Sequence, residues 1–465
     1  MKQICMRAAA LAMSLLGASS SAAQPLSTRN DPDIQAIAKD AYIFGYPLVL
    51  MYTTMRVTTN VSAPQKDGRA PMNQVGNLFA YAVPPQKDVV APNVNTLFSS
   101  MWLDVSKEPI VIHQPDTHGR YYVMETLDAW TNVIAAPGKR TTGTGAQDIA
   151  IVGPSWTGTL PRGITHDYRS PTNNVWIINR IQANGSKDYV VVNALQRAIT
   201  TTPLSGFGKP YTWPPGAVDS KIDMKTPVAK QVNAMSADAF FSTMAMAMMK
   251  NRPLVADSTI VARMAYIGLK PGSAFTMDAK MAADIRDGAR QGLEEIQNAS
   301  KNVGRIENGW MTLKTCGAYA TDYLTRAAVA SIGLGCNLPQ DAFYLTTMVD
   351  ATDKQLNGAH RYVLHFAAGQ EPAANAFWSI TMYDKDAYLV ANPIDRSAVS
   401  SWGDLKRNAD GSIDIWIQHE SPGAAKQANW LPSPSGDFVL MMRLYWARDE
   451  AIRGTWKPPA VTMQP

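Results

Sequence analysis

The residues best suited to chemistry lie in one stretch, Gly119 to Ala135, which reads GRYYVMETLDAWTNVIA. In an extended strand successive side chains point to opposite faces, and this stretch then gathers polar and aromatic groups on one face. That face carries Arg120, Tyr122, Asp128, Trp130 and Asn132. Arginine binds anionic or hydroxyl oxygens, rings stack on a ligand, and Asp and Asn side chains orient it. The pattern predicts a pocket for a sugar or a small carboxylated ligand.

A second group of short polar side chains lies nearby, in the sequence APNVNTLFSS at residues 91–100. Asn93 and Asn95 belong to this group, and we include both among the candidate ligand-binding residues. Side chains of this kind either satisfy the backbone of their own loop or line a polar pocket. Of these two explanations the composition favours loop capping.

The same residues also fit two other hypotheses. Under the second, the protein is an exported hydrolase or lyase in which Asp128 is the general base and Arg120 or Arg140 stabilises developing negative charge. Under the third, it is a structural envelope protein whose arginine and aromatic faces hold domains together, because these residue types are also enriched at protein interfaces. The long polar face of 119–135 is equally compatible with a solvated sheet or an inter-domain contact.

Arginines on the C-terminal strands raise the same question. Arg443 and Tyr445 share one face of a predicted strand at residues 437–446. Arginines on such strands are usually exterior, and a buried one is costly without a partner. If this face is interior, the arginine needs a ligand or a carboxylate such as Asp384 or Asp414.

Familiar catalytic motifs are absent from the sequence. It contains no GxSxG nucleophile elbow, no glycine-rich dinucleotide or phosphate loop, and no HExxH motif among its six histidines. We therefore predict neither a metal site nor a cofactor. The classes disfavoured are serine hydrolases of the common fold, zinc hydrolases, kinases and dehydrogenases.

Composition points to folded domains rather than to disorder. Of 465 residues, 46% are hydrophobic and 17% charged, against roughly 25% charged in an average globular protein. Single cores stop growing near ~250–300 residues, so two or three domains are expected. Without Lys2 and Arg7 the chain has 41 basic and 38 acidic residues, and it has no basic run interleaved with aromatics. Nucleic acid is therefore not an expected partner.

The first 23 residues read as an export signal. Lys2 and Arg7 form a basic start, residues 8–18 form a short apolar run, and small residues follow up to Ala23. The expected location is periplasmic or secreted. A second apolar stretch, residues 41–57, contains a proline and two tyrosines, and we expect a buried helix there rather than a membrane span. The mature chain is thus expected to have no membrane span.

Two cysteines remain after export, Cys316 and Cys336. The stretch from Thr315 to Ser331 has helical character, and a helix of that length separates its ends by roughly 20 Å or more. A disulfide needs Cα atoms within about 7 Å of each other. We therefore expect these cysteines not to pair, unless the chain doubles back.

The order of the expected elements is β, then helical, then β. A helix is expected from Ile34, with a kink or end at Pro47. Short strands separated by turn residues follow from about 73 to 193, helical periodicity runs to about 333, and alternating strands return from 341. The expected parts are a signal peptide at 1–23, a β-rich domain at 24–205, a helical segment at 206–335 and a β domain at 336–465.

At these residues the chain resembles a bacterial family that pairs two domains of unknown function, numbered 1254 (N-terminal) and 1214 (C-terminal). The motifs that carry the resemblance include AYIFGYPLVL at 41–50, ALQRAI at 194–199, RYVLHFAAGQEPAANAFWSITMYD at 361–384 and NWLPSPSGDFVLMMRLYW at 429–446. The resemblance implies a multidomain α+β chain with an N-terminal β-sandwich-like domain, a helical middle segment and a C-terminal β-sandwich or jelly roll. It leaves the reaction, the substrate and the oligomeric state open. One departure is Asn95, where relatives usually carry Asp.

Overall fold

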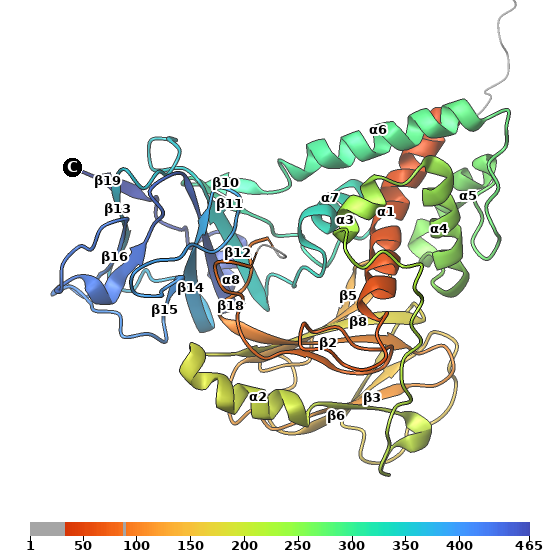
Figure 1. Cartoon of the computed structure of the whole chain (residues 1–465), viewed down its shortest axis with the longest axis horizontal. Helices are drawn as coiled ribbons and strands as arrows, with labels where there is room; N and C mark the ends of the chain where they lie inside the picture. The colour runs from red at the N-terminus through yellow and green to blue at the C-terminus, as the bar shows by residue number, and fades with distance from the viewer. Residues whose placement is uncertain (1–32, 87–89) are drawn as a thin grey trace, which may run out of the picture. The chain divides into compact units, whose positions relative to one another are not determined.

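The structure, a computed structural model, describes residues 33–86 and 90–465 (Figure 1). The expected export signal at residues 1–23 lies outside the described residues. Residues Ile34–Pro465 form one compact unit. Within it the structure confirms the coarser expectation of an α+β chain with strand-rich sheets and several helices.

Helix α1 (Ile34–Thr58) is the centre of the helical region, where Figure 1 shows it among α4, α6 and α7. Every residue from Ala41 to Met51 is buried, so the middle of the helix is covered on every side, and the helix runs through Pro47 instead of ending there. Gly288 of the neighbouring α6 has no room for a side chain, because an added Cβ would lie 2.3 Å from the carbonyl oxygen of Gln35. The helices packed around α1 are α3 (Val228–Asn233), α4 (Ala237–Lys250), α5 (Ser258–Met264), α6 (Ala282–Ser300) and α7 (Tyr323–Gly333).

The stretch at 41–57 is therefore a core helix, as expected. Among the described residues no helix is both long enough and apolar enough to cross a membrane.

The N-terminal strands form two sheets that share one hydrophobic core. The five-stranded sheet has the order β1 (Gly76–Leu78), β2 (Thr96–Asp104), β8 (Asn174–Gln182), β4 (Tyr122–Asp128), β5 (Val133–Ala135). The four-stranded sheet has the order β7 (His166–Arg169), β6 (Gln147–Val152), β3 (Ile110–Gln114), β9 (Thr200–Pro203). Leu103, Ile112 and Ile177 are among the fully buried residues between them. Helix α2 (Tyr189–Ala198) connects β8 to β9.

The C-terminal strands repeat this arrangement. The six-stranded sheet has the order β10 (Arg305–Glu307), β11 (Trp310–Thr312), β12 (Ala342–Thr347), β18 (Phe438–Ala447), β14 (Ala374–Asp384), β15 (Ala398–Ser400). The four-stranded sheet has the order β17 (Trp430–Pro432), β16 (Ile413–Gln418), β13 (Arg361–Phe366), β19 (Thr462–Gln464), and α8 (Asp449–Arg453) follows β18. Ile413, Ile415 and Ile417 alternate into the shared core, as their spacing predicts.

The expectation of one long strand over residues 119–135 is wrong. Strand β4 ends at Asp128, Thr131 adopts a left-handed backbone with φ 70°, and β5 begins at Val133. The side chain of Asp128 makes the turn, because its Oδ1 accepts hydrogen bonds from the backbone N–H groups of Trp130 (2.8 Å) and Asn132 (2.9 Å). The stretch is a tight hairpin.

The expectation that Cys316 and Cys336 stay unpaired is also wrong, because they form a disulfide with a Cα–Cα distance of 5.7 Å. The expected helix begins only at Tyr323, after Asp322 caps it by accepting a hydrogen bond from the N–H of Thr325 (3.1 Å). The chain on both sides of this shorter helix bends back, so the two cysteines meet.

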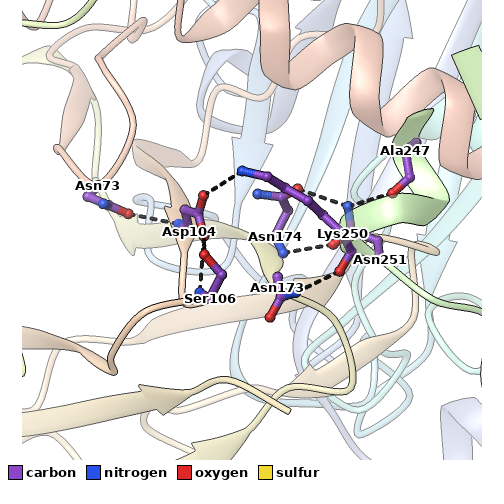
Figure 2. A network of polar contacts seen from close by, with 8 residues as sticks. All are labelled: Asn73, Asp104, Ser106, Asn173, Asn174, Ala247, Lys250 and Asn251. Atoms are coloured by element: carbon purple, nitrogen blue, oxygen red, sulfur yellow. Dashed lines mark hydrogen bonds and ion pairs between the residues drawn. The ribbon is translucent and has the colours of Figure 1, made fainter. Parts of the chain in front are cut away.

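The end of α4 is joined to the N-terminal sheet by a polar network, which Figure 2 shows. The buried amides of Asn174 and Asn251 bond to each other, because Asn251 Nδ2 donates to Asn174 Oδ1 (2.8 Å) and Asn251 Oδ1 accepts from the backbone N–H of Asn174 (2.8 Å). At the exposed side of the network Lys250 Nζ lies 3.0 Å from Asp104 Oδ2. The helical region is thereby attached to the ends of β2 and β8.

Candidate functional site

The five-stranded N-terminal sheet and the six-stranded C-terminal sheet pack against each other through their outer faces. Tyr121, directly before β4, and Val123 of β4 belong to the same buried cluster as Phe377 of β14 and Tyr445 of β18. The Tyr121 hydroxyl also donates a 2.6 Å hydrogen bond to the carbonyl oxygen of Asp341, next to β12. The two sheets thus form one continuous contact, and polar groups on either face are withdrawn from water.

A cavity of about 910 Å³ lies at one side of this contact. Its walls come from the loop before β2, from β1, β2, β8 and α2, and from β12 and β18 across the contact. The residues that line it include Asn93, Thr96, Phe98, Arg180, Tyr344 and Arg443.

Arg180, on β8, supplies one positive charge to the cavity wall. Its side chain is 8% exposed, and its Nη1 lies 2.7 Å from Glu125 Oε2 while Nη2 donates to the carbonyl oxygen of Gly335 (3.0 Å). The guanidinium also lies over the ring of Phe98, 5.4 Å from its centroid. Burial raises the pKa of Glu125 to about 7, against the attraction of Arg180.

Arg443, on β18, supplies a second positive charge from the other sheet. It is 2% exposed, and no carboxylate is among its hydrogen-bond partners. Its Nη1 donates to Thr381 Oγ1 (2.9 Å), and its Nη2 donates to the Tyr383 hydroxyl (2.7 Å). Burial opposes the charged form, but the neighbouring phenol oxygens outweigh it and raise the pKa of Arg443. The guanidinium therefore remains a buried cation without a counter-ion among these partners.

One nitrogen of Arg443 itself, Nε, is buried and has no hydrogen-bond partner among the described residues. The same is true of Asn95 Nδ2 and Thr96 Oγ1. Asn95 is held against the C-terminal sheet, because its Oδ1 accepts from Ser379 Oγ (2.8 Å), and Ser379 is the register partner of Arg443. Such atoms are rare, since buried polar groups are nearly always paired. Thr96 and Arg443 line the cavity, whereas Asn95 is not part of its wall.

The structure places one predicted site residue in the cavity wall and another directly beside it. Asn93 lines the cavity, where its Nδ2 donates to the Tyr445 hydroxyl (2.8 Å) and its Oδ1 accepts from the N–H groups of Asn95 and Thr96. Asn93 thus caps its own loop and also faces the cavity. Asn95 follows it at the base of β2.

The remaining predicted site residues are distributed elsewhere. Arg120 forms an ion pair with Asp188, and Arg140 forms one with Asp341 (2.7 Å). Tyr122 lies in the core between the two N-terminal sheets, on the face that the sequence pattern assigned to a pocket. The face of β4 that was expected to line a pocket therefore lies in the core between the two N-terminal sheets. The opposite face, which was expected in the core, contacts the C-terminal sheet.

Asp128, Trp130 and Asn132 stay together, but in the hairpin turn and not at the cavity. Asp128 Oδ2 accepts from Asn132 Nδ2 (2.9 Å), and the indole N–H of Trp130 donates to the carbonyl oxygen of Arg252 (3.2 Å). Burial raises the pKa of Asp128. The carboxylate expected to be a general base is used by the turn.

Two cavity residues carried weak signals in the sequence. Arg443 and Tyr445 share one face of their strand. Both are buried, so that face is interior. Arg180 interrupts an apolar run, VWIINRIQ, at residues 175–182, which marks a charge inside an otherwise buried strand. Neither signal indicates that Arg180 and Arg443 line the same cavity.

Two family models match the chain, and each match includes residues from one side of the cavity. Residues 72–203 match the family described as protein of unknown function (DUF1254), and residues 341–449 match the family described as protein of unknown function (DUF1214). The chain pairs these two domains. Arg180 lies in the DUF1254 match and Arg443 in the DUF1214 match, so each domain contributes one buried cation.

One solved structure shows a similar fold. The VPA0106 protein from Vibrio parahaemolyticus aligns with a TM-score of 0.71 and 23% identity, over 93% of this chain and 100% of that one. An uncharacterised protein from Burkholderia cenocepacia aligns with a TM-score of 0.41 and 11% identity, over 91% of this chain and 88% of that one. No curated protein matches the sequence.

Proposed function

We propose that this protein binds a small organic carboxylate in the cavity between its DUF1254 and DUF1214 domains. The observation that carries the proposal is the position of Arg443, a buried guanidinium that lines the cavity and has no carboxylate among its hydrogen-bond partners. Arginine and carboxylate form charge-assisted hydrogen bonds, which are roughly twice as strong as neutral ones. A carboxylate ligand supplies the negative charge that this buried cation favours.

The unpaired atoms beside Arg443 support the same ligand chemistry. Asn95 Nδ2 and Arg443 Nε are donors only, and the Thr96 hydroxyl can donate as well. Thr96 and Arg443 line the cavity, and a wall that carries cationic donors suits an anionic acceptor better than a sugar, whose hydroxyls need acceptors in addition. The cavity volume of about 910 Å³ lies within the usual range for small-molecule sites, roughly 300–1,000 Å³.

Two finer points belong to the proposal. We infer that each pair of sheets forms a β-sandwich, the C-terminal one of the jelly-roll type, which is supported by the single core that each pair shares. We also infer an exported protein in the periplasm or outside the cell, which residues 1–23 support.

The test is thermal unfolding of the full chain with benzoate or glucose at about 10 mM. A ligand with a Kd near 0.1 mM stabilises the folded state by about 2.7 kcal/mol at that concentration, so benzoate is expected to raise Tm and glucose to leave it unchanged. R443M is expected to abolish the benzoate effect. R453M removes an arginine from exposed helix α8 and is expected to preserve it. No benzoate stabilisation, or equal stabilisation of R443M, overturns the proposal.

A further inference from the structure

The two cavity arginines are each stacked on an aromatic ring of their own domain. Arg180 lies over Phe98 at 5.4 Å, and Arg443 lies over Tyr344 at 5.5 Å. Phe98 and Arg180 are register partners on the adjacent strands β2 and β8, and Tyr344 and Arg443 are register partners on β12 and β18. The same pair, a guanidinium with a ring on the neighbouring strand, thus occurs on both sheets.

Both rings line the cavity and are only half-buried, whereas their arginines are buried. The Tyr344 ring is held in place, because its hydroxyl accepts a hydrogen bond from Asn337 Nδ2 (3.0 Å). Leu78, Phe79 and Leu334 add further apolar surface to the wall. The cavity therefore combines cationic groups with a wall rich in rings and aliphatic side chains.

We infer that the carboxylate bound in this cavity is aromatic, with its charged group at the buried arginines and its ring against Phe98 and Tyr344. The inference rests on the proposed function, which specifies the carboxylate of the ligand, and it specifies the rest of the ligand as an aromatic ring. A flat aromatic ligand gains offset or edge-to-face contacts with two rings, which a saturated body of similar size does not make. A short carboxylate such as acetate reaches the arginines but leaves both rings uncovered.

Cations at the outer wall favour the entry of such an anion. Arg197 of α2 lies over the ring of Phe79 at 4.8 Å, and Lys66 lines the cavity beside Asp67, which is paired with Arg69. A cleft lined mainly by one sign of charge attracts ligands of the opposite sign and raises their association rate. The rings and aliphatic side chains of the wall thus suit the apolar part of the ligand, and its cations suit the carboxylate.

The experiment compares naphthoate with its saturated counterpart, decahydronaphthoate, by calorimetric titration of the full chain. The two ligands share a charge and a carbon skeleton, so their difference reports the aromatic contacts. Naphthoate is expected to bind roughly twofold to tenfold more tightly, which corresponds to the usual gain of aromatic pairs. In F98L, which retains an apolar side chain without a ring, this preference for naphthoate over decahydronaphthoate is expected to shrink.

The outcomes separate this inference from the proposed function. Equal affinity for the two ligands overturns the aromatic preference and leaves carboxylate binding in place. Tighter binding of the saturated ligand, or an unchanged preference in F98L, also overturns it. If neither naphthoate nor decahydronaphthoate binds, this inference fails, and if benzoate gives no stabilisation either, the proposed function fails with it.

Discussion

Arg180 and Arg443 line one cavity, although the first belongs to the DUF1254 domain and the second to the DUF1214 domain. Their surroundings differ in one respect. Arg180 has a carboxylate partner in Glu125 at 2.7 Å, whereas Arg443 is bonded to a hydroxyl of Thr381 and a phenol of Tyr383. No carboxylate offsets the charge of Arg443 among these partners, whereas the charge of Arg180 is offset whenever Glu125 is ionised.

This difference predicts that carboxylate binding strengthens as the pH falls from 8 to 6. Burial raises the pKa of Glu125 from 4.5 to about 7, so its negative charge is lost over this range and Arg180 becomes available to the ligand. Titration of benzoate at several pH values measures the effect. E125Q is expected to bind benzoate equally well across the range, and wild-type affinity that falls towards pH 6 contradicts the prediction.

The same carboxyl has a defined effect on stability. Because the pKa of Glu125 is raised in the folded state, the folded protein holds its proton where the unfolded chain has lost it. The stabilising contribution is full below about pH 4.5 and is lost as the pH rises through about 7. Unfolding in urea at pH 5 and pH 8 should therefore show a smaller pH difference for E125Q than for the wild type.

Reduction of the disulfide is expected to weaken both the fold and the cavity. Cys336 directly follows Gly335, whose carbonyl oxygen holds Arg180, and Leu334 lines the cavity. Closing a loop with a sequence separation of 20 stabilises a protein by about 3 kcal/mol in the chain-entropy model. Dithiothreitol should therefore lower Tm and benzoate affinity. The variant with serine at both positions should be weakened already and insensitive to dithiothreitol.

Local patterns predicted the elements more reliably than the contacts between them. The isoleucines of β16 alternate because the period of a strand is local, and the middle of α1 is buried because the residues from Ala41 to Met51 are apolar or aromatic on every side. The hairpin after Asp128 was missed for a physical reason. Alternation alone favoured a long strand, but the Asp128 side chain satisfies two backbone N–H groups of the turn and so ends the strand early.

The candidate site was predictable only in part. Asn93 and Asn95 could be proposed because short polar side chains are concentrated before β2. That Arg180 and Arg443 line the same cavity depends on how two sheets dock, and neither strand carries a pattern that specifies its distant partner. Arg120 and Arg140 match the chemistry of a site equally well, yet their carboxylate partners, Asp188 among them, lie far away in the sequence.

The amide pair in Figure 2 predicts a large cost for a small substitution. N251A removes both hydrogen bonds to Asn174. The backbone N–H and the side-chain Oδ1 of Asn174, which are buried, then lose these partners. An unsatisfied buried polar group costs about 1–3 kcal/mol, so the free energy of unfolding in urea should fall by that amount or more. N302A, at an exposed position, should change it by less than about 0.5 kcal/mol. Equal effects of the two substitutions contradict this account.

Arg326 of α7 is a buried cation of another kind. It is 0% exposed, none of its three side-chain nitrogens has a hydrogen-bond partner among the described residues, and the rings of Phe44, Trp130 and Tyr323 lie 5.1–5.6 Å from its guanidinium. Burial lowers the pKa of Arg326. The attraction of the rings and of the nearby carboxylates of Asp257 and Asp128 therefore works against a large desolvation cost.

This balance predicts that R326M is close to neutral, whereas R326A is strongly destabilising. Methionine fills much of the same space without a charge to desolvate, and buried ionic groups replaced by well-packed apolar ones often lose no stability. Alanine leaves a cavity among the rings, which costs about 2–5 kcal/mol for large buried side chains. Urea unfolding of both variants distinguishes packing from charge. If R326M loses as much stability as R326A, the guanidinium itself holds this region together through its charge.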